Sequence, residues 1–245
     1  MTEQGIPPLL PGRPVSEPAA AAINDAARQV RAPWAASVAG ILFAILFTAA
    51  MVLLRTWPVG TQDDNGLARL FAQGGDLPIV IGGLYLGPFA GITFLWFVAV
   101  IRDQVGERED RFFATVFLGS AILFVALLFV ALAVATSPVV AVRFLDLRAP
   151  TADEARLARS LAYTLLFAFA TRAAAVFLFS TATLGLRTGA FPRWFALTGY
   201  VAGAILLLVV NFWDWVILLL PAWVAVISVS ILRRERRARS APGTG

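Results

Sequence analysis

The chain has 245 residues, of which 59% are hydrophobic and 14% are charged, and its mean hydropathy is +0.79. A soluble domain has roughly half of its residues apolar and about a quarter charged. The apolar residues here form long unbroken runs, which indicates a membrane protein rather than a large soluble core. The net charge of +5 does not indicate nucleic-acid binding, because the arginines lie at the ends of the apolar runs, where membrane proteins place them.

Histidine, cysteine and lysine are absent, and all 20 basic residues are arginine. Without cysteine or histidine the chain has no disulfide, no iron–sulfur cluster, no Ser-His relay and no thiolate or imidazole metal site. A hard cation held by loop carboxylates stays open, but we expect no cofactor and no metal. We also expect no catalytic residue, because no general base lies near the serines at 120, 137, 160 and 180.

The expected fold is all-α, an integral membrane bundle of six transmembrane helices. Residues 1–31 form a polar tail that we expect to be disordered; its prolines prevent regular structure up to about residue 17, and a short helix over 19–31 is the alternative there. Residues 234–245 form a basic tail. Between them, residues 32–233 contain apolar runs close to the roughly 20 residues that a helix needs to cross a bilayer. We expect spans at about 34–54, 77–101, 112–136, 160–186, 194–210 and 216–232.

Two loops carry signals of further helices. Residues 63–66 read as a turn, and Leu67 and Phe71 follow at a spacing suited to a short interfacial helix. Thr151 and Glu154 fit a capping box, which predicts that a helix starts there and continues into the fourth span.

Glycines at four-residue spacing predict close helix packing in two spans. In the second span they share one face, for which the simplest partner is the small-residue stripe of the first span. We favour packing over a permeation role for these residues. The expected packing glycines are Gly83, Gly87, Gly91, Gly199 and Gly203.

One charge, Arg172, lies deep inside the fourth apolar run. An intramembrane arginine needs a wet pocket, a carboxylate or a route to the interface. Counting along the helices places Arg172 at mid-bilayer and Asp214 near the outer interface, with Asn211 one turn deeper. We therefore expect Arg172, Asn211 and Asp214 to form a polar intramembrane site. The alternative is that Arg172 satisfies helix-end carbonyls or extends to the interface.

With six spans, thirteen arginines lie on the side of the termini and six on the other side. This bias predicts that both termini are cytoplasmic. The exclusive use of arginine is typical of GC-rich bacterial genomes, which places the protein in a bacterial cytoplasmic membrane. The expected partners are the lipid bilayer, anionic lipid at the arginine-rich C-terminus, and a second copy or another membrane protein; no nucleic acid is expected.

The run Arg187-Thr-Gly-Ala-Phe-Pro-Arg-Trp-Phe-Ala-Leu-Thr-Gly-Tyr200 resembles a pattern of uncharacterised bacterial multi-pass membrane proteins. In that family, a domain of unknown function, a short Gly-x-x-Pro-Arg turn leads into a glycine-containing penultimate span. The resemblance covers mainly residues 187–232 and implies a fold type without an activity.

Two functions fit the sequence. The first is a non-enzymatic membrane protein that binds or passes a small solute, with an anion as the favoured kind, around Arg172. The alternative is a structural or interaction subunit of a membrane complex, assembled through the glycine-rich helix faces. An intramembrane enzyme acting on a lipid is the least favoured option.

Overall fold

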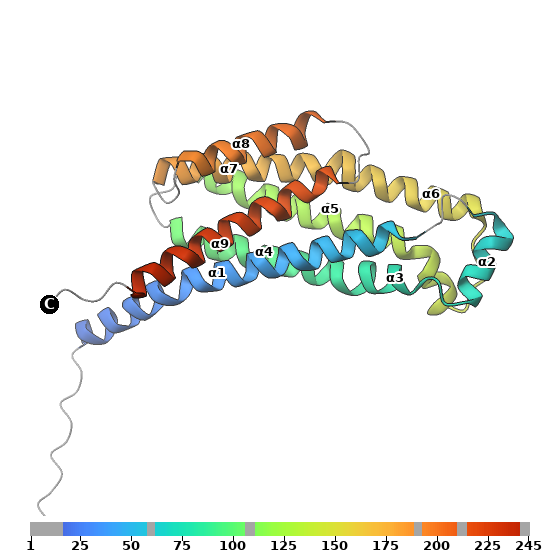
Figure 1. Ribbon diagram of the computed structural model, residues 1–245, viewed down its shortest axis with the longest axis horizontal. Coiled ribbons are helices and arrows are strands. Elements are labelled where there is room, and N and C mark those ends of the chain that lie inside the picture. The colour runs from blue at the N-terminus through green and yellow to red at the C-terminus, as the bar shows by residue number, and fades with distance from the viewer. Residues whose placement is uncertain (1–16, 58–61, 106–110, 189–192, 210–214, 241–245) are drawn as a thin grey trace, which may run out of the picture.

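The computed structural model describes residues 17–57, 62–105, 111–188, 193–209 and 215–240, and within these ranges it contains helices and no strand. The expected all-α fold is thus confirmed. Long helices lie side by side in an elongated bundle, with the start of α1 and the end of α9 at one end and the short helix α2 at the other (Figure 1). We call the latter the α2 end.

The helical elements follow one another in chain order with short connecting segments. They are α1 (Glu17–Arg55), α2 (Asp64–Ala72), α3 (Leu77–Ile79), η1 (Val80–Leu86), α4 (Gly87–Val105), α5 (Arg111–Arg143), α6 (Ala152–Tyr163), η3 (Thr164–Ala170), α7 (Thr171–Thr188), α8 (Arg193–Leu208), η4 (Val216–Leu218) and α9 (Leu219–Ser240). The segments η1 and η3 are π-helical, and η4 is a 3₁₀ turn.

Five helical segments in the described part of the chain are long and apolar enough to cross a bilayer: Trp34–Arg55, Leu77–Arg102, Ala114–Arg143, Ala152–Arg187 and Val216–Arg233. They correspond to five of the six expected spans. The remaining one, expected at 194–210, is the apolar helix α8, which has only 16 residues. A helix of that length rises about 24 Å, less than the roughly 30 Å of a typical hydrocarbon core.

The long helices form a ring in which each element packs on the next: α1 on α4, α4 on α5, α5 on α7, α7 on α8, α8 on α9, and α9 back on α1. Phenylalanines fill the centre. Phe94 of α4 is fully buried, and its ring centroid lies 4.8 Å from that of Phe43, 5.2 Å from that of Phe124 and 5.0 Å from that of Phe177. The core therefore joins α1, α4, α5 and α7 through tilted and edge-to-face ring contacts.

The glycines of the second span pack mainly against α5, so the expectation that they face the small stripe of the first span is wrong. A Cβ on Gly83 would meet Thr136, one on Gly87 would meet Leu132, and one on Gly91 would meet Phe129. The neighbouring Gly82 lies against Ala50 and Leu53 of α1, and Gly83 also comes near Leu54 of that helix. The predicted three do share one face, as their spacing implies, but the helix that this face meets depends on how the second span is rotated in the bundle, which spacing alone does not fix.

The other two predicted packing glycines lie in α8. A Cβ on Gly199 would meet Trp223 of α9 and Ala182 of α7, and one on Gly203 would meet Phe179 and the backbone of Ala175 on α7. All five predicted glycines therefore contact helices of the same chain.

A small second core covers the α2 end. Leu67 and Phe71 of α2 are buried, and the ring of Trp57 lies edge-on to Phe71. The capping box at the start of α6 is confirmed, because the Thr151 hydroxyl accepts from the Glu154 N–H and the Glu154 carboxylate accepts from the Thr151 N–H. The short helix after residue 63 and the helix start at Ala152 were therefore both readable from the sequence.

Candidate functional site

The structure places Arg172 at the junction of η3 and α7, with a half-buried side chain. Its guanidinium donates to the backbone carbonyl of Phe167 at 2.6 Å and to the Thr171 hydroxyl at 3.0 Å, both on its own helix. The Thr171 hydroxyl donates to the same carbonyl. Asn211 and Asp214, the predicted partners, lie outside the described residues, so the predicted three-residue site stays a prediction.

The partners of Arg172 lie at the junction of the π-helical segment with α7. The Thr171 N–H reaches back to the carbonyl of Leu166, five residues earlier, as π-helical bonding requires. The Phe167 carbonyl, one residue on, accepts from the side chains of Thr171 and Arg172. These contacts match the alternative in which Arg172 satisfies helix carbonyls.

A cavity of about 90 Å³ lies elsewhere, between the C-terminal end of α1, the C-terminal half of α5, the α6–η3 segment and the η4 turn that precedes α9. Figure 1 shows that α8 and the start of α9 stop well short of the far end of α6. Arg172 is not among the residues that line this cavity. Two other arginines are, Arg55 of α1 and Arg159 of α6.

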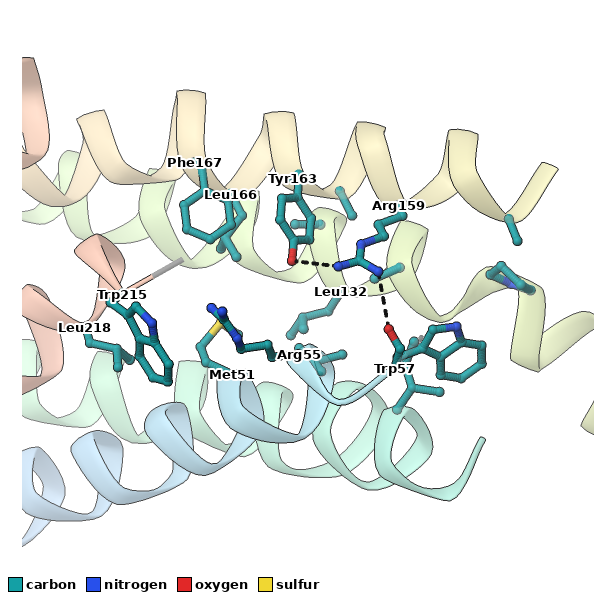
Figure 2. A pocket seen from close by; sticks show the side chains of 17 residues that line it. Met51, Arg55, Trp57, Leu132, Arg159, Tyr163, Leu166, Phe167, Trp215 and Leu218 are labelled. Carbon is teal, nitrogen blue, oxygen red and sulfur yellow. Dashed lines mark hydrogen bonds between the residues drawn. The ribbon is translucent and has the colours of Figure 1, made fainter. Parts of the chain in front are cut away.

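Arg159 points into the cavity from α6 (Figure 2). Its guanidinium donates to the backbone carbonyl of Trp57 at 3.2 Å and to the Tyr163 hydroxyl at 3.3 Å, and it lies 5.2 Å from the centroid of the Tyr163 ring. All of these partners are neutral. We call this cavity the Arg159 pocket.

Arg55 contributes a second guanidinium from the opposite wall. Its central carbon lies 4.8 Å from the ring centroid of Trp215, just before η4, so the charge lies over an aromatic face (Figure 2). Except for these arginines and the Tyr163 hydroxyl, the described lining consists of apolar and tryptophan side chains such as Met51, Leu132 and Phe167. The pocket thus combines positive charge with apolar walls.

The half-buried Arg159 differs from three other arginines at the α2 end, which all pair with carboxylates. Arg143 forms a bidentate ion pair with the buried Asp76, with Nε–Oδ2 and Nη2–Oδ1 distances of 2.8 and 2.7 Å. The hydrogen bond from Arg143 lowers the pKa of Asp76 below its ordinary value, so the pair stays ionised at neutral pH. Arg148 pairs with Glu154, and Arg156 pairs with Asp153.

In the described part of the chain, no carboxylate lies within ion-pair distance of Arg159. A guanidinium withdrawn from water without a counter-charge is unfavourable, and two neutral hydrogen bonds longer than 3 Å offset only part of that cost. An anionic group entering the pocket would supply the missing charge through charge-assisted hydrogen bonds.

The sequence predicted that Arg159 lies on the helix leading into the fourth span, among the six arginines on the side away from the termini, but it did not predict the pocket. A signal was present, because Arg159 and Tyr163 are four residues apart on a helix, on the same face as the apolar residues Ala155, Ala162 and Leu166. A charged residue and a hydroxyl on an otherwise apolar, inward-facing stripe is the pattern that distinguishes a lined cavity from a solvated helix face.

Comparison of the chain with protein-family models, with curated proteins and with solved structures finds no match. The resemblance over residues 187–232 therefore stays a prediction.

Proposed function

We propose that the chain is an integral membrane protein that binds a small anionic ligand in the Arg159 pocket. The observation that carries this proposal is a half-buried guanidinium that faces an apolar cavity and has only neutral hydrogen-bond partners. A ligand carboxylate or phosphate would complete the charge pair that the described chain does not supply. The expected anionic solute is thus retained, with its site moved from Arg172 to Arg159.

The membrane part of the proposal is supported by the five long apolar helices and by large apolar side chains on the outside of the bundle. Trp34 and Trp194 are more than half exposed; Trp34 begins the apolar segment Trp34–Arg55, and Trp194 is the second residue of α8. Exposed tryptophans at the ends of apolar segments are typical of the membrane–water interface. On this proposal the bilayer surrounds the bundle and the arginine-rich segment 233–239 adjoins anionic lipid.

The proposal places the protein in a bacterial cytoplasmic membrane with both termini in the cytoplasm, because the arginine bias favours that orientation. Reporter fusions at Gly245 and at Asp64 are expected to report the cytoplasm and the outside, respectively. Both fusions reporting the same side would contradict the orientation and the number of crossings between them.

A structural alternative for Arg159 is that it neutralises the C-terminal end of α1, since Trp57 follows that helix and its carbonyl accepts from the guanidinium. That role requires no ligand, so ligand binding distinguishes the two. The second proposed function, a subunit assembled through glycine faces, gains no support from the packing, because all five predicted glycines already contact other helices of the chain.

The test compares linear carboxylates from propionate to octanoate with the matching neutral amides. Purified protein in lipid nanodiscs is titrated with each compound, and affinity is measured by equilibrium binding of the isotope-labelled form. At least one carboxylate is expected to bind, and Arg159→Gln is expected to weaken it by about tenfold or more, the range of a lost charge-assisted hydrogen bond.

Arg172→Gln is the matched control, because it removes the same charge from a side chain that does not line the pocket. It is expected to leave carboxylate affinity unchanged. The proposal is wrong if amides bind as well as carboxylates, or if carboxylate affinity is the same in the Arg159→Gln variant as in the parent protein.

A further inference from the structure

The pocket wall formed by α5, α6 and η3 is polar at one end only. Arg159 and the Tyr163 hydroxyl lie toward the α2 end, and Leu132, Leu166 and Phe167 line the remainder. From Arg159 to Phe167 the chain advances eight residues, which corresponds to a length of about 12 Å along the helix. The wall therefore has room for a charged group followed by an extended apolar group.

The apolar end of this wall disfavours ligands that are polar throughout. On this wall, Ala131, Leu132, Leu166 and Phe167 offer no side-chain donor or acceptor; the donors Arg55 and Trp215 lie on the opposite wall. A sugar or nucleotide would lose hydrogen bonds to water along this wall and find none there in return, at a cost for each buried hydroxyl or amide. A hydrocarbon group has no hydrogen bonds to lose in the same place, and its burial against apolar side chains is favourable.

The apolar helical segments that carry this wall also favour a ligand with a hydrocarbon part. Leu132 belongs to the segment Ala114–Arg143 and Leu166 to Ala152–Arg187, which are both long and apolar enough to cross a bilayer. A ligand that dissolves in a membrane would reach a pocket at this level with its chain already out of water, and its charged head would remain near the membrane surface, toward the α2 end.

We infer that the ligand is a single-chain amphiphile: an oxyanion head, carboxylate or phosphate, bound at Arg159, and an unbranched hydrocarbon chain lying along Leu132, Leu166 and Phe167. This inference rests on the proposed function and specifies its ligand class. The head accepts hydrogen bonds from the guanidinium and the Tyr163 hydroxyl, and the chain fills the apolar end of the pocket.

The test varies chain length at constant head in the same nanodisc binding assay. Octanoate is expected to bind at least about tenfold more tightly than propionate, because each buried methylene group adds to the affinity. Octyl phosphate serves as a second probe, and its affinity relative to octanoate identifies which oxyanion the head position prefers.

Ala131→Leu is expected to fill the apolar end of the pocket, and to weaken octanoate about tenfold without weakening propionate. Ala133→Leu is the matched control: it adds the same side chain to α5 at an exposed position, and it should change neither affinity. If Ala131→Leu alters the melting profile, Leu218→Ala provides a second variant, which should weaken octanoate selectively by removing an apolar contact.

The outcomes separate this inference from the proposed function. Equal affinities of propionate and octanoate, both dependent on Arg159, would overturn the amphiphile and leave anion binding in place. Octanoate binding that is unaffected by Arg159→Gln would overturn both. Octanoate affinity that falls equally in Ala131→Leu and Ala133→Leu would place the chain outside the pocket and overturn the inference.

Discussion

Replacement of Phe94 by alanine is expected to lower the free energy of unfolding by about 3 kcal/mol, near the lower end of the range for deleting a buried phenylalanine. The ring is fully buried and contacts Phe43, Phe124 and Phe177 on three other helices. In the proposed membrane setting, truncation loses packing contacts rather than transfer from water, so the lower end of the range applies. Unfolding by a denaturing detergent, followed by circular dichroism, measures the effect.

The control for Phe94→Ala is Phe89→Ala on the same helix. Phe89 is 57% exposed, so its truncation leaves no cavity and is expected to change stability by less than about 0.5 kcal/mol. Equal losses in the two variants would show that the four-helix phenylalanine cluster is not the core of the bundle.

Gly87→Leu is expected to cost about 2 kcal/mol by overpacking the seam between α4 and α5. A Cβ at this position would meet the Leu132 side chain and would lie 3.2 Å from the Gly82 carbonyl oxygen. Leu132 is 4% exposed and has little freedom to move away. The same unfolding experiment in detergent measures the loss.

Gly119→Leu supplies the matched control for that seam. It makes the same change in a neighbouring helix at a position where an added Cβ meets nothing within 4 Å. Leucine is the better helix former, so this variant should be as stable as the parent protein or slightly more stable. A loss at 119 as large as that at 87 would mean that the glycine face between α4 and α5 is misplaced.

The helices were predictable because their signals are local. Uncharged apolar runs gave the long helices, and the Thr151–Glu154 box placed the start of α6 within a residue. The bounds of α8 were also predicted within two residues, because the span expected at 194–210 compares with Arg193–Leu208.

The partners of particular side chains were less predictable, because they depend on how helices rotate against one another. The spaced glycines of the second span share one face, but that face meets α5 rather than α1, and Arg172 finds its partners on its own helix. The pocket depends on the level at which the α8–α9 hairpin ends relative to α6. No single stretch of sequence encodes that relation, so Arg159 was predicted on its helix without the pocket that it lines.

The most direct test of the central claim is an experimental structure of the protein in a lipid bilayer, determined with octanoate present. Our account predicts elongated non-protein density in the pocket, with its polar end within hydrogen-bonding distance of the Arg159 guanidinium and its other end beside Phe167. A carboxylate of the chain itself paired with Arg159, in a pocket filled by the protein's own side chains, would contradict it.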